Sequence, residues 1–149
     1  MRKFQTSSSK ETKNLGAEFA EIVSATKPQK SARVLALSGE LGAGKTTFTQ
    51  GFLKALGVKE RVMSPTFIIM RRTSLKNKSY ENVFHIDAYR LKSPNELKVL
   101  DFKAIIKNPK NIVIIEWPEK VKTLIPKNAL WMNFSHNDNP KERTIIAKK

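Results

Sequence analysis

The sequence contains no cysteine, and this absence excludes disulfide bonds, thiolate metal sites and cysteine nucleophiles. A chain without cysteine is compatible with a reducing compartment. Long apolar runs are absent as well, since none approaches the roughly 20 residues that a membrane-spanning helix requires. Residues 1–6 lack the apolar core of a secretion signal. We therefore expect a cytoplasmic protein without a membrane partner.

Acidic residues are scarce, because 13 aspartates and glutamates stand against 28 lysines and arginines, a formal net charge of +15. A field of this sign attracts polyanions. The basic residues are scattered, with short clusters at 71–78, 103–110 and 120–127, and no RNA-binding motif or interleaved aromatic residues accompany them. Two interpretations stay open: a surface that attracts polyanions, and a basic surface that is merely solvated. DNA is not an expected partner.

Apolar residues are numerous enough for one core, since hydrophobic residues make up 40% of the 149-residue chain and this length is typical of one domain. Hydrophobic spacing and cap residues predict, in the first part of the chain, a helix at 9–25 behind the N-cap Ser8, a strand at 33–38, and a helix at 45–56 ended by Gly57.

The second part of the chain is predicted to add more strands than helices. We expect two antiparallel strands at 67–70 and 82–86 around a polar loop at 74–79, a helix that starts at Ser93 and carries Leu97, Leu100 and Ile105, an apolar strand at 112–115 in the centre of the sheet, and strands at 130–134 and 144–147. Together these elements predict a single α/β domain of the P-loop NTPase type over residues 1–149, with a mixed central β-sheet flanked by helices.

One motif in the chain carries recognisable chemistry. Residues 39–46 match the phosphate-loop pattern G-x-x-x-x-G-K-[ST] at every fixed position, between an apolar strand and a helix. Glycines let backbone N–H groups converge on phosphate oxygens, and the helix presents its positive N-terminus to the anion. The motif predicts a nucleoside triphosphate site with Mg²⁺, in which Lys45 contacts the phosphates and Thr46 contacts the metal. The nucleotide-binding residues expected in the loop are Glu40, Leu41, Gly42, Ala43, Gly44, Lys45 and Thr46.

Two carboxylates follow apolar strands. Asp87 comes directly after residues 83–86, and Glu116 after residues 112–115. Acids at the carboxyl ends of strands lie beside the phosphate loop in this architecture, where they can hold Mg²⁺ or orient the attacking water. The alternative for each is a residue that caps a strand or pairs with a lysine.

Four motifs occur in series: the loop at 39–47, Ser-Pro-Thr-Phe at 64–67, His-Ile-Asp-Ala-Tyr-Arg-Leu at 85–91, and Ile-Glu-Trp-Pro-Glu at 115–119. In this order the chain resembles the TsaE (YjeE) family. The resemblance implies a small, weak, Mg²⁺-dependent ATPase of bacterial tRNA threonylcarbamoyladenosine synthesis. It also implies a TsaB–TsaD complex as partner, with tRNA contacted only weakly or indirectly.

The same resemblance implies roles for individual residues. Thr66 is the expected sensor of the γ-phosphate or Mg²⁺, Thr47 and Trp117 lie near the nucleotide, and Asp87 and Glu116 are the metal-binding and catalytic acids. His85 shares a strand face with Asp87, and we interpret it as structural rather than catalytic. The side chain of Glu40 is expected to point away from the phosphates and to reach the nucleotide or a partner.

Other functions remain compatible with a phosphate loop. A small-molecule or nucleoside kinase is one, although the chain leaves little room for a second substrate pocket and an arginine-rich lid. A nucleotide-gated RNA-binding protein is another, which the net charge favours. A GTPase is less compatible, because the stretch at 77–80 begins Asn-Lys but lacks the acid that reads guanine.

Overall fold

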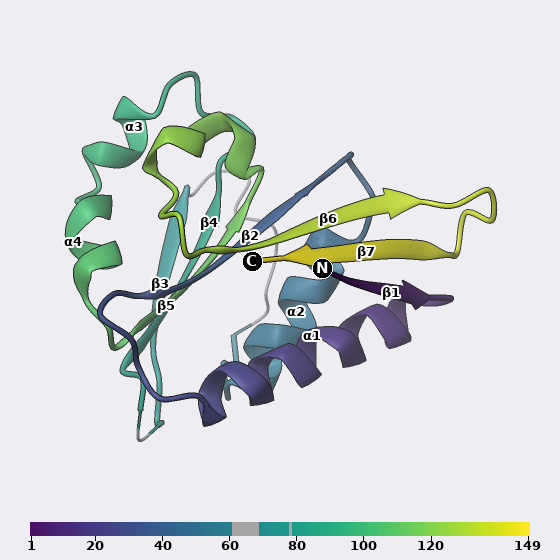
Figure 1. Cartoon of the computed structure of the whole chain (residues 1–149), viewed down its shortest axis with the longest axis horizontal. Helices are drawn as coiled ribbons and strands as arrows, with labels where there is room; N and C mark the ends of the chain where they lie inside the picture. Colours follow the sequence, from purple (N-terminus) through teal and green to yellow (C-terminus); the bar gives the residue numbers. More distant parts are fainter. Residues whose placement is uncertain (61–68, 78) are drawn as a thin grey trace.

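The computed structural model of the chain describes residues 1–60, 69–77 and 79–149. In that part of the chain seven strands form one sheet, in the order β1-β7-β6-β2-β5-β4-β3 (Figure 1). The strands are β1 (Arg2–Thr6), β2 (Arg33–Gly39), β3 (Met70–Ser74), β4 (Asn82–Asp87), β5 (Asn111–Glu116), β6 (Leu130–His136) and β7 (Arg143–Lys148).

The sheet is mixed, as the sequence predicts. β2 pairs in parallel with β5 and β6, and β4 pairs in parallel with β5, whereas β3, β7 and β1 run antiparallel to their neighbours. β2 is the middle strand and β5 lies beside it, with all of its residues buried. A strand covered on both faces has a continuous apolar run, which explains why the interior position of β5 is visible in the sequence.

Helices cover both faces of the sheet (Figure 1). Side chains alternate along the strands, so that Leu35 and Ile114 pack toward one set of helices while Val34 and Val113 pack toward the other. The first face carries α1 (Ser9–Ala25) and α2 (Lys45–Ala55), and the second carries α3 (Asn95–Lys98), α4 (Phe102–Lys107) and the 3₁₀ helix η1 (Pro118–Leu124).

Of the helices that the structure describes, none has the length and apolar character that a membrane span requires.

The start of α1 is fixed by a capping arrangement. The Ser8 hydroxyl accepts the backbone N–H of Glu11 at 3.1 Å, and the Glu11 carboxylate in turn accepts the backbone N–H of Ser7 at 2.6 Å. The first bond satisfies an N–H group that a helix start leaves without an intrahelical partner, and the second ties the residue before the cap to the first turn. The predicted N-cap and the predicted bounds of this helix are confirmed.

The region between β4 and β5 differs from the expectation. Instead of one helix, the structure has α3 and α4, separated at Asp101, whose φ of +59° breaks the helical path. Leu97 is buried as expected, but Leu100 is 37% exposed. The Glu96 carboxylate accepts the N–H groups of Lys92 and Ser93 ahead of α3, and these bonds lower its pKa.

The bounds of strand β3 also differ from the predicted ones. The expected strand at 67–70 begins instead at Met70, and its residues 67 and 68 lie outside the described part of the chain. The antiparallel pairing with the next strand is confirmed.

The edge strand β1 has no counterpart among the predicted elements. Its residues alternate weakly, and Arg2 and Lys3 are exposed, so the sequence carries little strand signal. Tertiary contacts define it: backbone pairing with β7, and the ring of Phe4 at 5.5 Å from that of Phe19 on α1. The short helix η1 was not expected either.

Two glycines let α1 and α2 approach closely. A Cβ at Gly16 would lie 2.2 Å from the Phe48 carbonyl oxygen, and a Cβ at Gly51 would lie 1.9 Å from that of Lys13. Neither distance is possible without separating the helices. The close approach carries the first turn of α1 toward the start of α2, where the phosphate loop lies.

We expect Gly51→Ala to destabilise the protein, although alanine is ordinarily the better helix former. Overpacking of this kind costs about 1–3 kcal/mol, and urea unfolding measures it. The control Ala55→Gly lies at the exposed end of α2 and should lose only about 0.5–1 kcal/mol of helix propensity. A Gly51→Ala protein as stable as the unsubstituted chain would contradict the observed helix packing.

Candidate functional site

The predicted phosphate loop joins β2 to α2 through three glycines with positive φ. These angles are +133° at Gly39, +75° at Gly42 and +104° at Gly44, a region that side chains with a Cβ rarely adopt. At Gly39 a Cβ would also lie 2.2 Å from the Phe134 carbonyl oxygen. The loop therefore requires glycine, and it delivers the N-terminus of α2 with Lys45 as its first helical residue.

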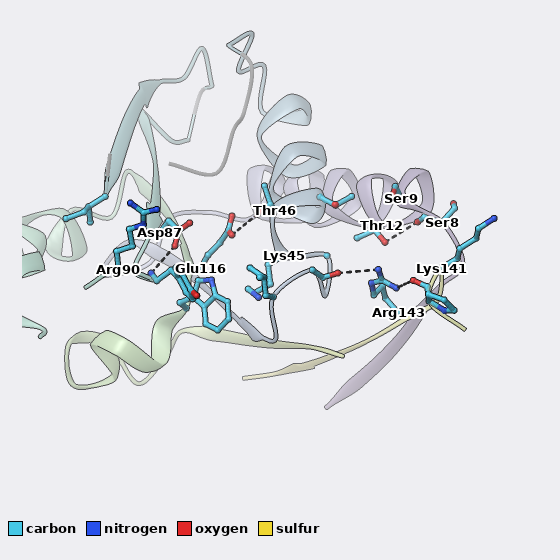
Figure 2. Close-up of a pocket in the computed structure, with 18 residues that line it drawn as sticks. Ser8, Ser9, Thr12, Lys45, Thr46, Asp87, Arg90, Glu116, Lys141 and Arg143 are labelled. Atoms are coloured by element: carbon cyan, nitrogen blue, oxygen red, sulfur yellow. Dashed lines mark hydrogen bonds between the residues drawn. The ribbon is translucent and has the colours of Figure 1, made fainter. Parts of the chain in front are cut away.

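A cavity of about 1020 Å³ opens over this loop (Figure 2). Lys45 lies between two sides of the cavity, with Asp87 and Glu116 on one side and Ser8, Thr12 and Arg143 on the other. We call the side with Asp87, Arg90 and Glu116 the acidic half, and the side with Ser8, Ser9, Thr12, Lys141 and Arg143 the distal half. Tyr89 and Trp117, which follow the two acids closely in the chain, are counted with the acidic half. The cavity is also lined by Leu41, Gly42, Gly44, Lys45, Thr46, Thr47, Ile69 and Pro140.

Lys45 is the cation at the centre of the cavity. Its ammonium group donates to the carbonyl oxygens of Gly39 at 2.6 Å and Glu40 at 2.8 Å, and it lies 4.0 Å from the centre of the Trp117 ring. Burial lowers its pKa, and the nearby carboxylates, chiefly that of Glu116, oppose the shift. The side chain is only 4% exposed, so a buried positive charge is held in place at the loop.

Glu116 connects the loop to the sheet. Its Oε2 accepts the Thr46 hydroxyl at 2.9 Å, and its Oε1 accepts from Nε2 of His85 at 3.0 Å. The carboxylate accepts only, so His85 must carry its proton on Nε2. Glu116 could have been a residue of the site or one that merely caps a strand or pairs with a lysine. The structure favours the first interpretation, since the side chain is 2% exposed and lines the cavity. His85, interpreted as structural from the sequence, contacts this carboxylate directly.

Asp87 lies opposite Glu116 in the parallel pairing of β4 and β5. Both residues end their strands, so both side chains reach the same edge of the sheet, as predicted. Asp87 lines the cavity and accepts the backbone N–H of Tyr89 at 2.9 Å. The Tyr89 ring lies 4.9 Å from that of Trp117, and the two form an aromatic wall of the acidic half.

A divalent cation would find oxygen donors in the acidic half. Within the described residues no three His, Cys, Asp or Glu side chains gather into a metal cluster. Thr46, Asp87 and Glu116 nevertheless supply a hydroxyl and two carboxylates at one end of a phosphate loop. Mg²⁺ is commonly held by one or two carboxylates together with phosphate oxygens and water, so this donor set fits Mg²⁺.

The remaining predicted site residues divide into three groups. Leu41, Gly42, Gly44, Thr47 and Trp117 line the cavity as expected. Glu40 and Ala43 do not line it: the Glu40 side chain is exposed and only its backbone contacts Lys45, and Ala43 is buried. Thr66, with the motif at 64–67, lies outside the described residues.

The distal half is the part of the cavity that the sequence did not reveal. Ser8 was identified as a helix cap, but nothing placed the start of α1 beside a loop more than 30 residues later. Lys141 and Arg143 come from the β6–β7 hairpin, and no local pattern marks them. Only the paired helices and strands bring these segments together.

Comparison with known proteins agrees with this geometry. The family model described as "Threonylcarbamoyl adenosine biosynthesis protein TsaE" matches residues 6–145. The tRNA threonylcarbamoyladenosine biosynthesis protein TsaE of Haemophilus influenzae is 34% identical over 133 residues, which cover 89% of this chain and 81% of that protein. The protein of the same name from Bacillus subtilis is 32% identical over 146 residues, covering 97% and 85% of the two chains.

Among solved structures, the crystal structure of Bacillus subtilis YdiB superposes with a TM-score of 0.70 and 28% identity, covering 97% of this chain and 82% of that one. The sequence relatives and the structural match both extend over nearly the whole chain. The order of motifs, the phosphate loop and these matches agree, and the chain belongs to the TsaE family.

Proposed function

We propose that this protein binds MgATP in the cavity and hydrolyses it, as the ATPase component of tRNA threonylcarbamoyladenosine synthesis acting with a TsaB–TsaD complex. The names of the relatives support the pathway. The observation that carries the ATPase proposal is the position of the Lys45 ammonium group. It is held at a glycine loop, next to the hydrogen bond between the Thr46 hydroxyl and the Glu116 carboxylate.

The two halves of the cavity give the nucleotide a direction. The terminal phosphates belong at the loop and the acidic half, because the metal-binding oxygens lie there. The nucleoside then extends into the distal half, where Ser8, Ser9 and Thr12 offer hydroxyl groups and Lys141 a cation.

The residues of the acidic half divide the work of hydrolysis. Bound Mg²⁺ would neutralise developing charge on the phosphates. Lys45 contributes a second positive charge. The Thr46 hydroxyl donates a hydrogen bond to Glu116, so its oxygen lone pairs can still coordinate the metal. Glu116 orients the attacking water, and His85 holds the carboxylate from behind.

The first test is phosphate release from ATP by the full chain with Mg²⁺ and without a phosphate acceptor. We expect slow release that rises when TsaB–TsaD is added and stops when the metal is chelated. ADP that forms only when an acceptor is added, without release of free phosphate, would instead support a kinase and contradict the proposed function.

Lys45→Ala should weaken MgATP binding about 10- to 100-fold, because hydrogen bonds to charged groups are among the strongest in proteins. Titration calorimetry measures the Kd. The matched control is Lys54→Ala, which removes the same charge from the last turn of the same helix. Equal affinities of the two variants would contradict the site assignment.

Glu116→Gln should spare MgATP binding and lower kcat about 100-fold or more, since glutamine keeps the shape but cannot act as a base toward water. Single-turnover hydrolysis and binding are measured side by side. If binding and hydrolysis fall together, Glu116 acts in metal binding or folding rather than in orienting water.

His85 is expected to act on kcat through Glu116. His85→Leu removes the donor to Oε1 and should lower kcat about 10- to 100-fold with little change in Kd. His85→Gln keeps an amide donor on a similar reach and should recover much of the rate. If His85 served only in core packing, the two variants would differ in thermal stability but not in kcat. Equal kcat values for His85→Leu and His85→Gln would therefore contradict a role through Glu116.

A further inference from the structure

The β6–β7 hairpin contacts the backbone carbonyls of the phosphate loop. His136 and Arg143 are directly paired across the two strands, near the tip of the hairpin. Nε2 of His136 lies 3.3 Å from the Leu41 carbonyl oxygen, and Nη2 of Arg143 donates to the Gly42 carbonyl oxygen at 3.3 Å. Two neighbouring side chains therefore contact two consecutive carbonyls of the loop.

The Arg143 guanidinium is itself fixed by the hairpin. Its Nη1 donates to the carbonyl oxygens of Glu142, at 2.8 Å, and of Pro140. The same planar group thus joins the hairpin backbone to the loop backbone, and Figure 2 shows it between the two. Arginine suits this role because its donors form a rigid fork, whereas a lysine ammonium is a single mobile point.

Peptide geometry converts these contacts into control over the loop. In a planar trans peptide the C=O and the following N–H point in opposite directions. A Leu41 carbonyl held by His136 turns the N–H of Gly42 away from the hairpin, and a Gly42 carbonyl held by Arg143 does the same for the N–H of Ala43. The Ala43 N–H accordingly donates inside the loop, to the Glu40 carbonyl oxygen at 3.1 Å.

Glycine makes such control necessary. Gly42 and Gly44 adopt positive φ, and glycine samples both signs of φ readily, so this sequence alone leaves the peptide planes of the loop free to rotate. Backbone N–H groups bind phosphate well only when they already face it. A side-chain clamp on the Leu41 and Gly42 carbonyls restrains the peptide planes that carry the Gly42 and Ala43 N–H groups, the second of which is bonded within the loop.

We propose that His136 and Arg143 are positioning residues that hold the phosphate loop in its binding conformation, an inference that rests on the proposed nucleotide site. They act through the Leu41 and Gly42 carbonyls rather than by contact with phosphate. Since a carbonyl oxygen only accepts, His136 donates from Nε2 in this arrangement.

The test compares MgATP affinity among full-length variants by titration calorimetry. Arg143→Ala and His136→Leu should each raise Kd about threefold to tenfold, the range expected for one lost hydrogen bond. Arg143→Lys keeps the charge but loses the fork, and it should resemble Arg143→Ala. His136→Gln keeps a donor and should resemble the unsubstituted chain. Lys148→Ala, an exposed charge at the other end of β7, is the control and should leave Kd unchanged.

Salt separates positioning from simple attraction of the phosphates. At 1 M salt the screening length falls to about 3 Å, so an effect due only to long-range charge would shrink there. The loss caused by Arg143→Ala should persist in high salt. Arg143→Lys behaving like the unsubstituted chain, or a loss that disappears in high salt, would overturn the clamp and leave Arg143 as an electrostatic contributor.

A second measurement decides the inference without nucleotide. ¹⁵N relaxation of the nucleotide-free protein should show lower order parameters at Gly42 and Ala43 in Arg143→Ala and His136→Leu, but not in Lys148→Ala. Unchanged order at both residues would overturn the clamp. If instead the unsubstituted chain failed to bind MgATP while the order parameters changed as expected, the proposed function would fail and the clamp on the loop would stand.

Discussion

The site depends on the hydrogen bonds that the Glu116 carboxylate accepts. A charge that is 2% exposed is costly unless it is hydrogen bonded, and here each oxygen has its own donor, Thr46 from α2 and His85 from β4. The same carboxylate opposes the lowering of the Lys45 pKa by burial. One side chain thus joins the phosphate loop to two parallel strands and places an acid, a hydroxyl and a cation within one cavity.

The fold brings this centre within reach of distant segments. Parallel β4 and β5 end together, which sets Asp87 beside Glu116. The glycine contacts between α1 and α2 bring the cap of α1 to the cavity from one direction, and the antiparallel β6–β7 pair brings Arg143 from another. The cavity is therefore built from the ends of elements that lie far apart in the chain.

Charged side chains of both signs line the cavity. Lys45, Arg90, Lys141 and Arg143 line it together with Asp87 and Glu116. The acids are confined to one half, where Glu116 accepts the Thr46 hydroxyl, and Lys141 and Arg143 belong to the other (Figure 2). The proposed MgATP would place its metal in the acidic half, and the proposed clamp keeps the loop in a receptive conformation.

Local patterns in the sequence determined the phosphate loop, the cap of α1, the two acids and the interior strands, because each depends on a few adjacent residues or on burial of a continuous apolar run. They also carried the family resemblance. Tertiary structure alone decided the break between α3 and α4, the edge strand β1, the contact of His85 with Glu116, and the distal half with its hairpin arginine. Apart from the break, which lies at the positive φ of Asp101, these features depend on pairing between segments far apart in the chain, and no local pattern encodes which segments will meet.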